Sequence, residues 1–524
     1  MDLRCSNIAN IVIFCRNSEP RFETDLFENF RKQADHWISE GFSITVLLEY
    51  DALIDLRYKE YIENNINKIE TGAWLEVVKP LCEDAGIKWR GRENFSWDWF
   101  ANVGFTVGYA PEERLKLADA YMKRYLSIFG EYPETVGCWI IDAVTLKYLE
   151  TEYRIKTACF CRDQWGTDGY NLWGGYYGQA YYPSVNNSFC PAQSRKNQIN
   201  IPVFRMLGPD PVHQYDAGLN KDGDLSVCDS QPCITMEPVI SDAGGNPDWV
   251  KWFFDCLTGY NPLNFGYVQI GQENSFSWKD AENGVKVQSK MLKKYISEGK
   301  IVCETLGETG KKFREIYAIT PESDIYYPND FINGNTGSYW FCSRFYRINV
   351  YWENGTVRIR DIFLFDDSRE ERYLKTPCKT TGLLYDNLPV VDGYRQSGNQ
   401  IRAGWYPKIG GEYFRSRKYS VRKRKDGVHL LLSDGQNNFT FIFKEQKVEI
   451  LCNKDFILER LCCCEDYGKL TAGDQIWNFS FDNRDYSVLV ENGKIEGTYG
   501  IVSNEGNVSI KFSSGTENAG VYYE

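Results

Sequence analysis

Hydrophobic positions up to about residue 310 follow two alternating periods. Short, almost continuous apolar runs, which are typical of buried strands, are followed by longer stretches whose apolar residues recur every three or four positions, as in amphipathic helices. This order predicts a parallel sheet with crossover helices. The expected strands are residues 11–14, 44–48, a short run just before Arg90, 136–141, 156–160, 203–207, 234–236, 266–270 and 300–303.

The expected helices have clear end signals. Residues 25–40 carry an apolar stripe and are followed by Gly41, and a second helix begins at Pro111 and stops at Gly130. Proline in the first turn and glycine just past the last turn are typical of helix termini. Further helices are expected at residues 248–257 and 279–297. The repeated alternation favours a closed or nearly closed (β/α) barrel over an open sheet.

Beyond about residue 310 the pattern changes to short β-rich runs separated by glycine-marked turns. The runs are residues 347–353, 357–364, 428–432, 439–443 and 448–451. Such punctuation predicts an antiparallel β-sandwich. A chain of 524 residues exceeds the size of one hydrophobic core, so we expect a barrel domain over residues 1–310 and a β-rich part over residues 311–524.

Charge and composition narrow the classes of partner. The net charge of -12 argues against nucleic acid, and the short basic run at residues 422–425 is interpreted as a solvated turn. Mean hydropathy of -0.46 gives no membrane signal. Without a signal-peptide pattern, the seventeen cysteines are expected to be reduced thiols in a cytoplasmic protein. No zinc-type ligand spacing occurs, so neither metal nor cofactor is expected, and the oligomeric state, a homo-oligomer included, stays open.

Carboxylates follow several of the predicted strands. In parallel barrels the active site lies at the carboxyl ends of the strands, where this sequence places Asp142, Glu237, Glu273 and Glu304. Splitting a glycosidic bond requires two carboxyl groups on either side of the anomeric carbon. Each residue has an alternative role. Asp142 precedes a helix and is as well suited to an N-cap as to catalysis, whereas Glu237 and Glu304 could pair with nearby arginines.

An aromatic, glycine-rich segment follows the predicted strand at residues 156–160. Residues 165–182 hold seven aromatic side chains among five glycines, and aromatic residues make up 15% of the chain. Flat rings stack on sugar faces, so we interpret this segment as a substrate wall. Packing of the rings against the barrel itself is the alternative. The expected substrate-binding residues are Glu19, Arg21, Arg90, Trp97, Asp163, Trp165, Tyr176, Glu237 and Glu304.

One strand resembles a known family. Residues 137–142, GCWIID, are similar to the Gly-x-Trp-Leu-Pro-Glu strand of glycoside hydrolase family 57, whose last carboxylate is the nucleophile, and family 38 has an aspartate in that role. Residues 271–278, GQENSFSW, resemble the segment that supplies the acid. Two departures stand out: residues 16–20 replace the His-x-His-x-Pro of family 57, and Asp142 stands where that family has Glu.

Over nearly its whole length the chain also resembles a group of bacterial glycoside hydrolase/deacetylase proteins. That resemblance implies a (β/α)7-type barrel with a β-rich C-terminal domain, but no particular activity. The strand-end carboxylates and the strand similar to family 57 lead us to predict a retaining glycosidase acting on an oligosaccharide or glycoconjugate. Asp142 is the expected nucleophile and Glu273 the expected general acid and base.

Two alternatives remain at this point. A polysaccharide deacetylase would share the barrel but needs a metal-bound water, and its usual pair of histidines on one helix is absent from a chain with three scattered histidines. A non-catalytic carbohydrate-binding protein would keep the aromatic segment without opposed carboxylates. The first distinguishing observation is whether two of the four strand-end carboxylates face one another.

Overall fold

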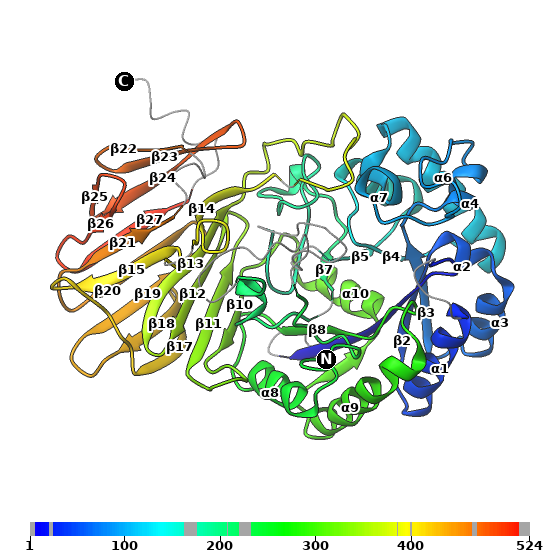
Figure 1. The fold of residues 1–524 in the computed structure, drawn as a ribbon, viewed down its shortest axis with the longest axis horizontal. Helices are drawn as coiled ribbons and strands as arrows, with labels where there is room; N and C mark the ends of the chain where they lie inside the picture. Colours follow the sequence, from blue (N-terminus) through cyan, green and yellow to red (C-terminus); the bar gives the residue numbers. More distant parts are fainter. Residues whose placement is uncertain are drawn as a thin grey trace.

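The computed structural model has two halves lying side by side, an α/β half at the N-terminal end and an all-β half at the C-terminal end (Figure 1). It describes residues 6–19, 25–161, 175–206, 208–219, 232–384, 386–398, 401–463 and 469–512. The predicted fold class, an α/β barrel followed by antiparallel β-structure, is confirmed.

The α/β half is built on a mostly parallel sheet in which β1 pairs with three other strands. That strand pairs with β2 along its second half and with β8 and β9 along its first half. The path of the sheet is β6-β7-β5-β4-β3-β2-β1-β8, and β6 alone of these strands runs antiparallel to its neighbour. The strands are β1 (Asn7–Cys15), β2 (Ile44–Leu48), β3 (Ile69–Trp74), β4 (Thr135–Cys138), β5 (Thr157–Phe160), β6 (Ala180–Tyr181), β7 (Val203–Arg205), β8 (Gly266–Ile270) and β9 (Val302–Glu304).

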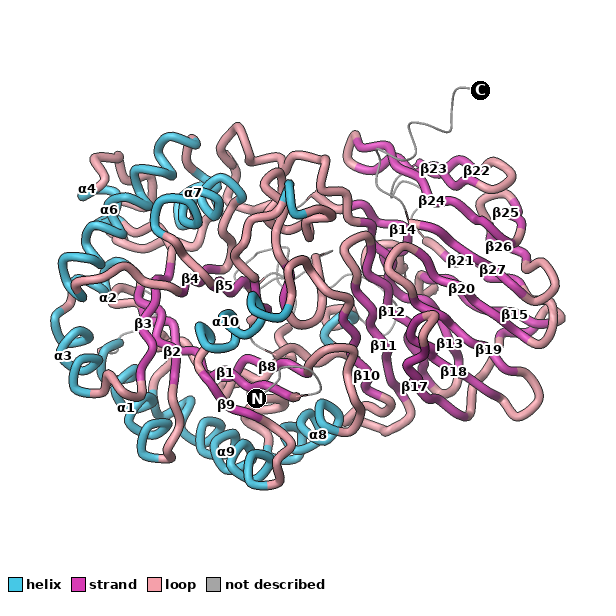
Figure 2. Tube along the Cα trace, turned by 180° about the vertical axis from the view of Figure 1, so that it is seen from behind, coloured by secondary structure: helices cyan, strands magenta, loops and turns pink. Residues whose placement is uncertain are grey.

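The barrel is left open on one side. Within the described residues no backbone pairing joins β7 to β8, and the rings of Phe204 and Tyr267, 5.1 Å apart, fill the interior between them. Helices cover the outside of the sheet (Figure 2). They are α1 (Leu26–Ser39), α2 (Tyr50–Ile54), α3 (Leu56–Asn64), α4 (Lys79–Asp84), α5 (Ala101–Gly104), α6 (Pro111–Phe129), α7 (Ala143–Tyr153), α8 (Pro247–Thr258) and α9 (Trp278–Ser297).

Helix α10 (Leu306–Ile316) closes the amino end of the barrel. The Leu306 amide donates to Thr45 Oγ1, 2.9 Å away, at the start of β2, and Gly310 packs against Thr157 at the start of β5. A Cβ at Gly310 would lie 2.0 Å from Thr157 Oγ1, so the close approach of helix and strand requires glycine there. The opposite, carboxyl end of the strands is left for the candidate site.

Two predicted strands of the barrel were wrong. The third strand is β3 rather than a run before Arg90, and its pattern is weak because it contains a polar Glu70 and a Gly72 that packs tightly against Leu47. Residues 234–236 form no strand and make a single isolated bridge between Pro209 and Thr235.

The C-terminal half consists of two antiparallel sheets. The first has the order β10-β11-β12-β13-β15-β21-β26-β25, with β14 beside β13 and β16 beside β15, and the second runs β17-β18-β19-β20-β27-β24-β23-β22. The strands are β10 (Ser323–Tyr327), β11 (Thr336–Cys342), β12 (Tyr346–Glu353), β13 (Thr356–Leu364), β14 (Leu388–Asp392), β15 (Gly404–Ile409), β16 (Glu412–Tyr413), β17 (Lys418–Arg424), β18 (Gly427–Ser433), β19 (Asn438–Phe443), β20 (Lys447–Cys452), β21 (Ile457–Leu461), β22 (Lys469–Ala472), β23 (Ile476–Phe481), β24 (Arg484–Asn492), β25 (Lys494–Glu496), β26 (Gly500–Val502) and β27 (Asn507–Lys511).

In the first of these sheets, the strands β11 to β14 are buried on both faces. Along β11, Tyr339 and Phe341 belong to the core between the two sheets, whereas Trp340 and Cys342 belong to the core shared with the barrel. Successive side chains of a strand point to opposite faces, so one strand serves two cores. The cysteines in the described residues are free thiols, and none of the helices described is long and apolar enough to cross a membrane.

Candidate active site

Four strand ends direct carboxylates toward one arginine. Arg16, fully buried directly after β1, donates to both oxygens of Glu76 at 2.7 and 2.8 Å. Its Nη1 also donates to Glu273 Oε2 and lies 3.7 Å from Glu19 Oε2. Arg16, Glu19, Glu49, Glu76 and Glu273 are called the Arg16 cluster below.

The sheet register brings these residues together. Cys15 pairs with Leu48, so Arg16 lies level with Glu49 at the end of β2, and the Glu49 amide donates to the Cys15 carbonyl at 2.8 Å. The chain after β8 folds back over β1, where Asn274 Oδ1 accepts from the Arg16 amide at 2.9 Å. Parallel strands end at the same edge, which is why residues far apart in sequence meet here.

Aromatic rings line the floor of the cluster. Phe14 and Trp74 stack with centroids 4.0 Å apart, and Trp139 packs edge-on against both. The Arg16 guanidinium lies 5.0 Å from the Trp97 ring, and the indole nitrogen of Trp97 donates to Glu76 Oε2 at 3.0 Å. An apolar surrounding of this kind strengthens every charge interaction inside it.

Glu49 and Glu76 form a carboxyl pair with opposite protonation. Burial, followed by the charges of Asp51 and Glu76, raises the pKa of Glu49 well above its ordinary value. Burial opposes ionisation of Glu76 as well, but the charge and hydrogen bonds of Arg16 outweigh it and lower the pKa of Glu76 to about 2. Neither oxygen of Glu49 accepts a hydrogen bond from the described residues, so Glu49 is best placed as the neutral, proton-carrying member.

The two predicted catalytic residues lie in different places. Glu273 belongs to the cluster, whereas Asp142 is the N-cap of α7 and accepts from the Thr145 amide at 3.0 Å. Its carboxylate also accepts from Thr106 Oγ1 at 2.6 Å, Thr145 Oγ1 at 2.7 Å and Arg114 Nη1 at 2.9 Å, and it is fully buried. The N-cap alternative is therefore confirmed, and a nucleophilic role for Asp142 stays a prediction.

Of the predicted substrate-binding residues, Glu19 belongs to the Arg16 cluster, and Trp97 contacts Arg16 and Glu76 of that cluster. Arg90 instead forms an ion pair with Glu113 at the start of α6 and stacks on Tyr109. The Tyr176 hydroxyl donates to the Pro321 carbonyl at 2.9 Å, which places that ring at the junction of the two halves.

Two further predicted residues are Glu304, which lies away from the cluster, and Glu237, which makes a local contact. Glu304 is the register partner of Asn10, six residues before Arg16, and hence about 20 Å from the cluster along the strand. It pairs with Lys312 of α10. Glu237 accepts from Thr235 Oγ1 at 2.8 Å. Arg21, Asp163 and Trp165 lie outside the described residues.

Sequence reasoning missed Glu76 and gave no site role to Glu49. The signal was nevertheless present, because each follows an apolar run at the end of a strand, as in Leu47-Leu48-Glu49 and Trp74-Leu75-Glu76. Misplacing the third strand hid this parallel. With β3 at its observed position, the strand-end rule selects Glu76 directly.

The described residues offer no ready metal site. Among them no group of three or more His, Cys, Asp and Glu side chains is arranged to hold a metal ion. Each histidine has a local partner: His36 lies 2.9 Å from Ser289 Oγ, His213 pairs with Asp330, and His429 pairs with Asp426. The described residues therefore do not by themselves supply the ligands for the metal-bound water that a deacetylase uses.

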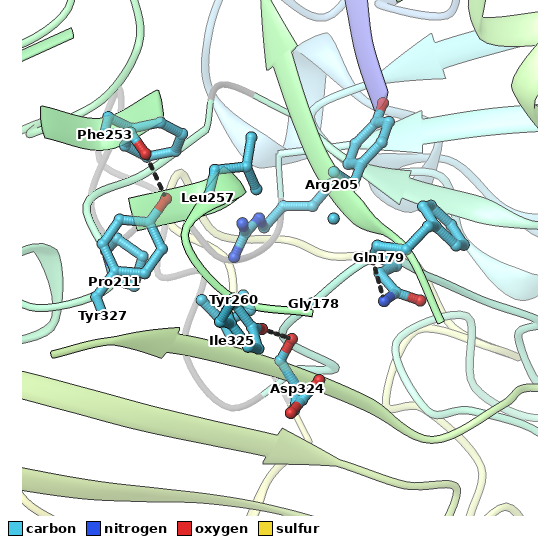
Figure 3. A pocket seen from close by; sticks show the side chains of 13 residues that line it. Gly178, Gln179, Arg205, Pro211, Phe253, Leu257, Tyr260, Asp324, Ile325 and Tyr327 are labelled. Atoms are coloured by element: carbon cyan, nitrogen blue, oxygen red, sulfur yellow. Dashed lines mark hydrogen bonds between the residues drawn. The ribbon is translucent and has the colours of Figure 1, made fainter. Parts of the chain in front are cut away.

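A separate cleft lies at the junction of the halves, where β7 and β8 are unpaired. It encloses about 370 Å³ of empty space, part of it open to solvent. Figure 3 shows the Arg205 side chain extending into it from the end of β7, with Tyr327 and Asp324 of β10 on other walls. Gly266, at the amino end of β8, also lines it, so this cleft is distinct from the Arg16 cluster at the carboxyl end of the sheet.

Comparison with known proteins gives a fold relationship. No family model and no curated protein matches the chain. Among solved structures, a candidate glycoside hydrolase/deacetylase from Parabacteroides distasonis matches with a TM-score of 0.56 and 16% identity over 73% of this chain and 91% of that one. At this identity the match shows a shared fold. The matched share of this chain is larger than the share that the α/β half alone occupies.

Two other solved structures match less well. A candidate polysaccharide deacetylase from Mycobacterium smegmatis has a TM-score of 0.37 and 8% identity, over 60% of this chain and 92% of that one. A GH57-type branching enzyme from Pyrococcus horikoshii has a TM-score of 0.31 and 10% identity, over 59% and 70%. Neither similarity is strong enough to support a conclusion.

Proposed function

We propose that this chain is a glycoside hydrolase that cleaves its substrate with two carboxylates of the Arg16 cluster. The observation that supports this proposal most directly is that Glu19 Oε2 and Glu273 Oε2 both lie near Arg16 Nη1. Sharing one nitrogen limits the two oxygens to a separation of about 6 Å, against roughly 5–5.5 Å in retaining enzymes and roughly 6.5–9.5 Å in inverting ones. The spacing supports retention of anomeric configuration.

The surroundings favour distinct roles for the two carboxylates. Glu273 touches the guanidinium directly, and a charge-assisted contact favours an ionised group, which suits the nucleophile. Glu19 is farther from the cation, at 3.7 Å, which suits the group that gives and then takes the proton. This assignment replaces Asp142 as nucleophile, because the Asp142 oxygens are already engaged by four hydrogen bonds inside the protein.

Arg16, Glu76 and Glu49 hold this pair in place. The two hydrogen bonds to Glu76 fix the plane of the guanidinium, and the ring of Trp97 restrains Glu76 in turn. A neutral Glu49 keeps the net charge of the site from becoming more negative, which supports a close approach of two further carboxylates. The fold shared with the Parabacteroides protein, itself described as a candidate glycoside hydrolase/deacetylase, agrees with a carbohydrate-active enzyme.

The test is hydrolysis of a panel of aryl glycosides and natural oligosaccharides, with product anomers followed by NMR. We expect Glu273→Gln to reduce turnover by about a thousandfold or more, since it removes a group that forms or breaks a bond. Glu304→Gln is the matched control, because it makes the same change at the opposite end of the barrel and should retain turnover.

Asp142→Asn separates the two candidate nucleophiles. The cluster assignment requires folded Asp142→Asn protein to keep most of its turnover, although it loses stability with the Arg114 ion pair. An inactive, folded Asp142→Asn variant beside an active Glu273→Gln variant would reverse the assignment. Binding of sugars without hydrolysis by the wild type would instead indicate a carbohydrate-binding protein.

A further inference from the structure

The hairpin formed by β17 and β18 carries an unusual concentration of positive charge. Seven cationic residues occur within residues 415–425, and all are exposed. Lys423 donates to the Pro262 carbonyl. None of the other six forms an ion pair among the described residues. The basic hairpin is defined by Arg415, Arg417, Lys418, Arg422, Lys423, Arg424 and Lys425.

Elsewhere on the surface, many cations have acidic partners. Arg57 pairs with Asp55 at 2.7 Å, Lys251 with Asp255 at 2.5 Å, and Arg124 with Asp84 at 2.7 Å. In a chain of net charge -12, what distinguishes this hairpin is the concentration of six cations without an ion pair in eleven consecutive residues. Like charges within a screening length of about 8–10 Å repel one another, and a bound polyanion relieves that repulsion while releasing counterions.

The hairpin packs against the first sheet while its charges remain in solvent. Tyr419 stacks on Trp352 with centroids 4.4 Å apart, and Val421 faces the core residue Leu430 across the hairpin. Arg422 and Arg424 lie on the other face of the strand, and alternate residues of a strand are about 7 Å apart. Since β17 is an edge strand, Arg422 and Arg424 lie along the rim of the second sheet.

The basic hairpin lies away from the Arg16 cluster. Pro262, which accepts from Lys423, is in the loop that leads into the amino end of β8, whereas the cluster lies at the carboxyl ends of the strands. A polymer held by the hairpin would thus be anchored beside the catalytic half rather than threaded into the site itself.

We propose that the basic hairpin is a binding site for an acidic polysaccharide, a polymer with carboxylate or sulfate groups along its chain. A dense group of exposed cations complements the closely spaced anions of such a polymer. The choice of a polysaccharide over another polyanion rests on the proposed glycoside hydrolase function.

The experiment measures binding of the full chain to sodium polygalacturonate by isothermal titration calorimetry at low salt. The fully methyl-esterified polymer is the ligand control, since it keeps the sugar backbone but lacks the charge. The Glu273→Gln background prevents any cleavage, so the binding result does not depend on whether the proposed hydrolase function holds.

Two charge-matched variants test the location. Arg422→Gln/Arg424→Gln/Lys425→Gln removes three cations from the basic hairpin, and Lys116→Gln/Lys123→Gln/Lys290→Gln removes three exposed cations from α6 and α9. We expect the hairpin variant to weaken polygalacturonate binding at least tenfold and to flatten its salt dependence. The control variant should bind polygalacturonate with unchanged affinity. The esterified polymer should not bind.

Three outcomes would overturn the proposal. Equal weakening by both variants would mean that binding depends on the overall charge of the protein and not on a site at the basic hairpin. Binding of duplex DNA as tight as that of polygalacturonate would indicate a nucleic-acid surface. Unchanged affinity together with aggregation of the hairpin variant would show that the cations merely protect an edge strand from pairing with other chains.

Discussion

At the scale of single residues, Arg16 holds the candidate site together. Its side chain is fully buried and contacts three carboxylates, those of Glu19, Glu76 and Glu273. Removing one partner of a buried ion pair leaves the other charge without compensation, at a cost of roughly 3–5 kcal/mol. Arg16 is therefore a structural requirement of the candidate site.

We expect Arg16→Met to lower the free energy of unfolding by about 3–5 kcal/mol at neutral pH, measured by chemical denaturation, because the cluster keeps its carboxylates but loses its cation. Arg31→Met is the control, since Arg31 pairs with Glu28 at a surface position where both side chains are more than a third exposed. Its effect should stay within about 1 kcal/mol. Equal losses in the two variants would contradict a dominant role for Arg16.

The strand-end rule predicted part of the site from sequence. It placed Glu19 and Glu273 correctly at the carboxyl end of the sheet, where both contact Arg16. It could not separate the two roles of Asp142, because an N-cap and a catalytic carboxylate both follow a strand and precede a helix. The deciding partner, Arg114, comes from α6 and is brought near only by the fold.

At the scale of elements, the connection between β13 and β14 is held against the start of α7. The Glu371 carboxylate accepts from the Ala143 amide and from the Ser188 amide, each at 2.9 Å, and Arg114 donates to the Tyr373 carbonyl at 2.7 Å. Burial, followed by the charge of Asp142, raises the pKa of Glu371 to about 7. Two buried carboxylates thus lie near each other at this contact, and only Asp142 forms an ion pair with Arg114.

This contact predicts a specific pH dependence of stability. The pKa of Glu371 is higher in the folded protein than its ordinary 4.5, so the folded state binds the proton more tightly. The resulting stability is present below about pH 4.5 and is lost progressively up to about pH 7, an amount of roughly 3 kcal/mol. Glu371→Gln should remove that loss and be more stable than wild type at pH 8.

The measurement is the free energy of unfolding against pH for wild type, Glu371→Gln and the control Glu370→Gln. Glu370 is the exposed neighbour of Glu371 and pairs with Lys375 in solvent. Its substitution should leave the wild-type pH profile unchanged. A Glu371→Gln profile parallel to wild type between pH 5 and 8 would refute the contribution of this contact.

Local signals explain which elements were predicted well. Helix α1 begins after its N-cap Asp25 and ends before Gly41, whose φ is +94°, and α6 runs from Pro111 to Gly130 as expected. These ends are set by residues at or directly beside the end of each helix. In β3, by contrast, Gly72 is required by packing against Leu47 and Thr135, which no local pattern reveals.

At the scale of the whole molecule, the sheet of β10 to β13 joins the two halves. Trp340 stacks on Tyr177 with centroids 4.3 Å apart and donates to the Pro211 carbonyl at 2.8 Å. The buried Arg347 and Asp361 pair on this sheet, and Arg347 also donates to the Gly175 carbonyl at 2.7 Å. The sequence predicted the sandwich but not this contact between the halves. In a sequence, a buried arginine cannot be told from one at the surface, and β11 is apolar on both faces, so its pattern does not show which face meets the barrel.

We expect the two halves to unfold in a single transition, since they share one hydrophobic core. Trp340→Ala should lower the midpoint of that transition, with a loss of roughly 3–5 kcal/mol. Tyr499→Ala, at a side chain 77% exposed, is the control and should have little effect. Differential scanning calorimetry that resolves two transitions in the wild type would contradict a shared core.

The most direct measurement of the catalytic assignment is covalent trapping. Retaining glycosidases form a glycosyl-enzyme intermediate on the nucleophilic carboxylate, and a 2-deoxy-2-fluoroglycosyl fluoride makes that intermediate long-lived. After incubation with a panel of such sugars, intact-mass and peptide mapping should show one added fluorosugar on Glu273. A label on Asp142, or turnover with inversion and no label at all, would contradict the Arg16 cluster as the site of a retaining reaction.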